Sequence, residues 1–208
     1  MLKEVFNEIM VIFKKVIKQP VDGVSEIFST KKESNFNLSM VLISLTGFIY
    51  FIIPYLIFIL NTEGYMRRSV KIKFFIFIGI VVIIYLLCIS IFTFLVKSIK
   101  GFRNFKQELF TGALSGIPML LFIMLYCFFS LFSETLPTLI GPFNFKTILE
   151  IGIYLFVVIF YLLLVTSNII YQSIVSSNIN ANLSWYISPL VLFLSFYVSY
   201  KIAFVIFD

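Results

Sequence analysis

The stretch FFIFIGIVVIIYLLCISIFTFLV, residues 74–96, contains no charged side chain and decides the fold. About 20 consecutive apolar residues cross the roughly 30 Å hydrocarbon core of a bilayer as an α-helix. Segments of comparable length and apolar character lie at 39–60, 109–132, 148–170 and 186–207. Because an open sheet cannot satisfy its backbone in lipid, the sequence predicts an all-α polytopic bundle of five transmembrane helices over 39–208. Residues 1–38 are predicted to form a separate cytoplasmic segment.

The composition of the whole chain agrees with this interpretation. Hydrophobic residues make up 61% of the sequence and charged residues 12%, and the mean hydropathy is +1.06. A soluble domain has about 25% charged residues. A chain of 24.1 kDa could not hide this much apolar surface from water, so a bilayer is the solvent that its composition requires.

The distribution of Lys and Arg predicts the orientation. The connections at 61–73, 97–108, 133–147 and 171–185 are too short to hold a soluble domain. With the N-terminus inside, ten Lys and Arg residues outside the spans fall on the cytoplasmic side and five on the other. The positive-inside rule therefore predicts a cytoplasmic N-terminus and an external C-terminus. We expect the membrane to be an inner or plasma membrane.

The first 19 residues have the pattern of an amphipathic helix that Pro20 ends. Apolar residues recur at helical spacing, and Lys14, Lys15 and Lys18 lie on the opposite face. One interpretation is a helix in the membrane interface that engages anionic lipid through these lysines. The other is a helix packed under the cytoplasmic face of the bundle.

The sequence lacks the residues that most enzymes need. It has no His, and its only aspartates, Asp22 and Asp208, lie near opposite ends. An imidazole base, a His-ligated metal and an intramembrane aspartyl pair are thereby excluded. Among the acids, only Glu150 is expected near a span, at its edge. We therefore expect no enzyme, no catalytic residue, no cofactor, no metal site and no nucleic-acid partner.

The third span begins with a pattern of small residues. Gly112 and Gly116 form a small-xxx-small face on which another helix can pack closely, within one chain or in a homo-oligomer. Pro118 follows them, and a kink is expected there.

Polar side chains recur at heptad-like spacing along the last two spans. The fourth span carries Tyr154, Tyr161, Asn168 and Gln172, and the fifth carries Ser188, Ser195 and Ser199, with Lys201 close by. Such stripes are typical of interhelical hydrogen-bond seams, and a substrate path is the alternative interpretation. Lys201 can extend its ammonium toward the membrane surface, or it can serve as a functional cation that holds a lipid phosphate.

Three parts of the sequence resemble the Yip family of five-span, Rab-interacting membrane proteins in its bacterial form. Residues 17–28 are similar to the proline-led entry to the first span, and 101–108 to the entry to the third. Residues 113–121 resemble the small-residue, Ile-Pro-Leu-Leu-type helix that follows. The resemblance covers about residues 10–207 and implies a non-enzymatic membrane protein. The acidic Asp-Leu-Tyr-Gly-Pro motif of eukaryotic members is absent, so no partner-binding residue carries over.

These observations favour a protein that organises membranes, or acts in trafficking-like roles, through helix packing and contacts with lipid or other membrane proteins. The alternative is a transporter, a permease subunit or a lipid-translocating bundle. It would use Asn168, Gln172 and Ser195 as a polar path with Lys201 at its outer end.

Overall fold

The described part of the chain is helical almost throughout. The computed structural model describes residues 2–30, 36–61, 72–102, 104–132 and 145–207. These residues form seven helices and no strand. The helices are α1 (Leu2–Lys18), α2 (Asp22–Thr30), α3 (Phe36–Asn61), α5 (Ile72–Ser98), α6 (Phe105–Phe132), α8 (Phe145–Val175) and α9 (Ala181–Phe207).

Five of these helices are long and apolar enough to cross a membrane, as expected. The candidate spans are Phe36–Ile59, Ile72–Ser98, Phe105–Leu125, Phe156–Val175 and Ala181–Ile206. The all-α five-span prediction is therefore confirmed. The charged residues 31–32, 67–68, 71 and 103, which entered the orientation argument, lie outside the described residues, as does most of the connection at 133–147.

The turn between α8 and α9 is tighter than the expected connection at 171–185. Asn178 adopts φ 57°, a left-handed conformation that Asn tolerates better than most residues, and α8 ends before it. The Asn180 side-chain oxygen then accepts a hydrogen bond of 2.9 Å from the backbone N–H of Asn182, which caps the start of α9. Local capping therefore sets these helix ends, whereas hydropathy marks only the apolar part of each helix.

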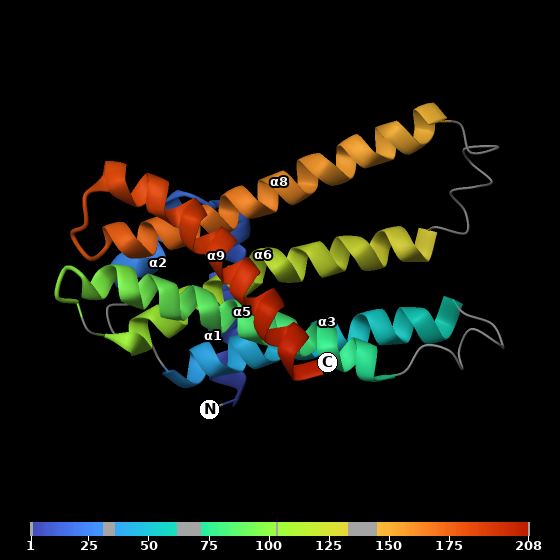
Figure 1. The fold of residues 1–208 in the computed structure, drawn as a ribbon, viewed down its shortest axis with the longest axis horizontal. Coiled ribbons are helices and arrows are strands. Elements are labelled where there is room, and N and C mark those ends of the chain that lie inside the picture. Colours follow the sequence, from blue (N-terminus) through green and yellow to red (C-terminus); the bar gives the residue numbers. More distant parts are fainter. Residues whose placement is uncertain (1, 31–35, 62–71, 103, 133–144, 208) are drawn as a thin grey trace.

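α6 lies at the centre of the bundle and is the most buried of the five spans. It contacts α3, α5 and α8, and α9 packs against α5 and α8. Figure 1 shows α8 diverging from α6 toward the N-terminal end of α8. α6 and α8 therefore pack most closely at the end where α5 turns into α6 and α8 into α9.

Two glycines allow α6 to approach its neighbours. A Cβ at Gly112 would collide with the Ser90 side-chain oxygen and the Leu86 backbone carbonyl of α5. A Cβ at Gly116 would lie 2.8 Å from the Thr46 side-chain oxygen of α3. Pro118 follows inside the same helix, which continues through it to Phe132. The small-residue face thus packs within the chain, against two different helices.

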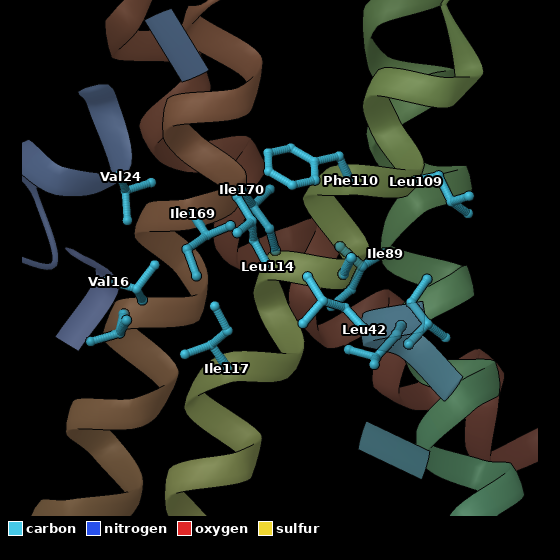
Figure 2. Close-up of a cluster of buried hydrophobic side chains, with 14 of the residues drawn as sticks. Val16, Val24, Leu42, Ile89, Leu109, Phe110, Leu114, Ile117, Ile169 and Ile170 are labelled. Carbon is cyan, nitrogen blue, oxygen red and sulfur yellow. The ribbon is translucent and has the colours of Figure 1, made fainter. Parts of the chain in front are cut away.

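The N-terminal helices pack against this bundle. Ile12 and Val16 of α1 and Val24 of α2 belong to the same buried apolar cluster as Ile169 of α8 and Ile117 of α6 (Figure 2). α1 lies across the spans rather than along them (Figure 1). The described part of its apolar face therefore packs against the bundle. This agrees with the interpretation of α1 as a helix packed under the bundle. Its placement in a membrane interface stays a prediction.

The glycines of α6 give a graded prediction for stability. Gly112→Ala places a methyl group against backbone, which cannot move without shifting a helix. Gly116→Ala meets only side-chain atoms, which can rotate. We expect Gly112→Ala to cost about 1–3 kcal/mol of unfolding free energy and Gly116→Ala clearly less, as overpacking does in cores. Reversible unfolding in mixed detergent–SDS micelles measures both, and equal losses would contradict the assigned contacts.

Candidate functional site

α5 ends in a glycine-dependent turn. Gly101 has φ +84°, a conformation that glycine adopts without a Cβ clash. The backbone N–H of Gly101 donates to the Ser98 carbonyl at 2.9 Å, and that of Phe102 to the Lys97 carbonyl at 3.2 Å. These two bonds form a Schellman motif. The turn returns the Phe102 ring over Lys97, whose ammonium nitrogen lies 5.5 Å from the ring centroid.

Lys97 and Glu108 form a buried ion pair across this turn. Lys97 Nζ lies 2.8 Å from Glu108 Oε1, and both side chains are 0% exposed. An isolated charge in so dry an environment would cost several kcal/mol, so the two groups are tolerable only as partners. The short connection between α5 and α6 therefore has both of its ends fixed inside the bundle.

Hydroxyl groups from two helices complete the cluster. Lys97 Nζ donates to Ser173 Oγ of α8 at 2.8 Å, and the Ser173 hydroxyl lies 3.3 Å from Glu108 Oε2. Thr111 Oγ1 of α6 lies 2.6 Å from Ser173 Oγ. A buried polar network is stabilising when all of its members are satisfied. This cluster, Lys97, Glu108, Thr111 and Ser173, joins α5, α6 and α8 at one point.

The arrangement favours structural joining over chemistry. The amine and the carboxylate bond to each other and to Ser173, so neither is free to act on a substrate in this conformation. Within the described residues, no three His, Cys, Asp or Glu side chains gather closely enough to hold a metal ion.

A polar pocket of about 460 Å³ lies beside the ion pair. Phe102, which contacts Lys97, also lines this pocket. The remaining walls come from α2, the start of α6 and the end of α8, which Figure 1 shows meeting at one end of the bundle.

The structure does not gather the polar residues that the sequence singled out along α8 and α9. The Asn168 side chain donates to the Pro20 carbonyl at 2.8 Å, and Gln172 lines the polar pocket. Lys201 is exposed, with its ammonium 5.8 Å from the Tyr197 ring centroid. Ser188, a member of the predicted stripe on the fifth span, does contact α8, because its hydroxyl lies 3.1 Å from that of Ser167. The Tyr154 side chain lies outside the described residues.

The other members of that predicted stripe are also separate. Tyr161 is exposed on α8. Ser199 donates its hydroxyl to the Phe196 carbonyl at 2.9 Å, a bond within its own helix. The Ser195 hydroxyl oxygen is buried and has no hydrogen-bond partner among the described residues.

Sequence reasoning missed the ion pair because it placed Lys97 and Glu108 in the connection at 97–108. The expectation that Glu150 is the only acid near a span is wrong, since Glu108 is buried inside the candidate span of α6. A usable signal exists in the helical spacing of Ser90, Thr93 and Lys97 on α5. Glu108, Thr111 and Ser115 repeat that spacing on α6, and all six side chains are buried.

Comparison with protein families, curated proteins and solved structures finds no match. The resemblance to the Yip family therefore rests on the residues quoted above.

The ion pair predicts strongly non-additive mutations. Lys97→Met removes one partner and leaves a buried carboxylate without its counter-charge, which costs about 3–5 kcal/mol. Glu108→Gln leaves the buried Lys97 amine without its counter-charge, and we expect a similar loss of unfolding free energy. The double variant removes both charges, and we expect it to be more stable than either single variant. Unfolding in mixed micelles measures the coupling, and additive effects would show that the two charges act independently.

Proposed function

We propose that this chain is a non-enzymatic integral membrane protein that acts through contacts with lipid and with other membrane proteins, as the Yip resemblance implies. One observation carries the proposal. Most polar side chains buried among the described spans bond to one another or to backbone, and they do not line a common passage. A protein that moves polar solutes needs such groups to face the solute.

The cavity among the spans supports the same conclusion. It measures about 340 Å³ and is lined mainly by apolar residues of α3, α5, α6, α8 and α9. Four lining residues carry a hydroxyl, and Tyr85 is one of them. The other three, Tyr50, Thr166 and Ser199, donate to the backbone carbonyls of Met119, Leu162 and Phe196, respectively. Such a cavity suits hydrocarbon chains better than ions or polar solutes.

The outward face of α1 supplies the lipid contact in this proposal. Met10, Val11 and Ile17 are exposed there, beside the exposed Lys14 and Lys18. Apolar side chains flanked by lysines are typical of helices that lie against anionic headgroups. Lys15 differs from its neighbours, because its ammonium lies 2.8 Å from Glu26 of α2. We therefore assign the membrane-surface role mainly to Lys14 and Lys18.

The lipid contact predicts a preference for anionic headgroups near α1. A Val11→Trp probe in a Trp185→Phe background reports nearby lipid, since Trp185 is the chain's only tryptophan. In liposomes, brominated phosphatidylglycerol should quench this probe more than brominated phosphatidylcholine. Lys14→Gln with Lys18→Gln should remove most of the difference, because each lysine near the surface contributes about 1 kcal/mol.

Lys73→Gln is the matched control for that experiment. It removes the same charge from an exposed position at the start of α5, at the opposite end of that span from Lys97. It should leave the quenching difference unchanged. Equal quenching by the two lipids in the unmodified probe protein would contradict an anionic-lipid contact at α1.

Lys201→Leu separates the proposal from the transport alternative. Because Lys201 is exposed and its ammonium lies near the Tyr197 ring, we expect normal folding and an unchanged set of co-purifying proteins. Purification from the native membrane in mild detergent, with mass spectrometry of the product, measures both. Recovery of the chain alone, as a homo-oligomer or with non-transport membrane proteins supports the proposal. A stoichiometric ATPase or permease subunit, or a solute flux in liposomes that Lys201→Leu abolishes, contradicts it.

A further inference from the structure

We propose that the 460 Å³ polar pocket at the converging end of the bundle binds an uncharged, hydroxyl-rich group, such as the sugar headgroup of a membrane glycolipid. This inference goes beyond the proposed function and does not depend on it. The volume is within the range of about 300–1,000 Å³ that small-molecule sites occupy in proteins.

Side-chain amides that bond to no other described residue line the pocket. Gln107 lines the pocket, is only 8% exposed, and its side-chain amide has no hydrogen bond to another described residue. Among the described residues, the fully buried side-chain atoms without a partner belong to Ser177 and Ser195, so the Gln107 amide is open to water in the pocket. A ligand that displaces this water has to replace its hydrogen bonds, which hydroxyl groups can do. The side chains of Asn104 and Gln172 line the same pocket and also lack such bonds within the described chain. Three amides thus offer both donors and acceptors to one space.

The charges around the pocket favour a neutral ligand. Its lining contains Ser, Asn, Gln, Phe and Val side chains and no charged residue among those described. The nearest buried charges, Lys97 and Glu108, already neutralise each other at 2.8 Å. Among the described lining residues, an ion would find no counter-charge to offset the loss of its water, whereas hydroxyl groups could bond to the amides without that loss.

The location and the aromatic walls favour a sugar ring at the membrane surface. The lining residues Asn104 and Gln107 lie at the start of the α6 span, and Gln172 and Ser176 at the end of the α8 span. Span ends lie where the hydrocarbon gives way to lipid headgroups. Phe28 and Phe102 add apolar surface against which the C–H face of a sugar ring can pack.

Native mass spectrometry of the full chain tests this proposal. The protein is purified in lauryldimethylamine oxide, which carries no sugar, and offered equal amounts of three dioleoyl lipids. These lipids are diacylglycerol, monoglucosyl diacylglycerol and phosphatidylglycerol, so only the headgroup varies. We expect the glucosyl lipid to be retained at least about fivefold more than diacylglycerol, as one or two net hydrogen bonds would produce. Addition of free glucose then distinguishes the source, since displacement indicates a soluble sugar and retention indicates a lipid.

Three variants tie the binding to the pocket. Gln107→Leu and Gln172→Leu each remove one amide from the pocket lining. Ser25→Trp fills the pocket with a large side chain, and because Ser25 is exposed, folding should tolerate this substitution. Each should lower retention of the glucosyl lipid toward that of diacylglycerol. Gln19→Leu, at an exposed site outside the pocket, should leave it unchanged. If Gln107→Leu fails to fold, Gln172→Leu and Ser25→Trp still test whether the glucosyl lipid binds in this pocket.

Two results would overturn the proposal. One is equal retention of the glucosyl lipid and diacylglycerol by the unmodified protein, which would show that the amides bind no headgroup. The other is preferred retention of phosphatidylglycerol that falls on Lys100→Gln with Lys106→Gln. That outcome would assign the region to anionic lipid held by the exposed lysines around the turn.

Discussion

The buried contact between Lys97 and Glu108 constrains one whole end of this molecule. Two opposite charges with no exposed surface can persist only in contact, so the end of α5 and the start of α6 must meet in one register. Ser173 extends the requirement to α8, because it bonds Lys97 and lies close to Glu108. The Schellman turn at Gly101 makes the contact possible by reversing the chain within a few residues.

Close packing around α6 reinforces that register. Helices in lipid gain little from hydrophobic association, so small residues that let backbones approach contribute much of the packing energy. Gly112 lies against α5 and Gly116 against α3, one helical turn apart. Sliding α6 by one residue would therefore break the ion pair and also drive side chains into backbone. Polar pairing and steric fit select the same arrangement.

The N-terminal helices link the converging end of the bundle to the membrane surface. Asn168 of α8 holds the Pro20 carbonyl between α1 and α2, and Lys15 of α1 pairs with Glu26 of α2. Buried Ile12 and Val24 attach the two helices to the spans. In our proposals this arrangement presents Lys14 and its neighbours to anionic lipid on one side. On the other, α2 forms one wall of the polar pocket.

Composition and apolar run length by themselves determined the all-α fold and the positions of five spans, because a bilayer leaves the backbone no other partner. The small-xxx-small spacing marked Gly112 and Gly116 as a packing face, since that pattern is local to one helix. Only the tertiary structure decided which polar residues meet. The sequence pattern predicted Lys97 and Glu108 in a loop and Asn168 in a seam with α9. In the structure, the register of the helices brings Lys97 and Glu108 into contact, and Asn168 bonds to the Pro20 carbonyl. Hydropathy records how apolar a segment is, whereas the partner of a buried polar group depends on side chains distant in sequence.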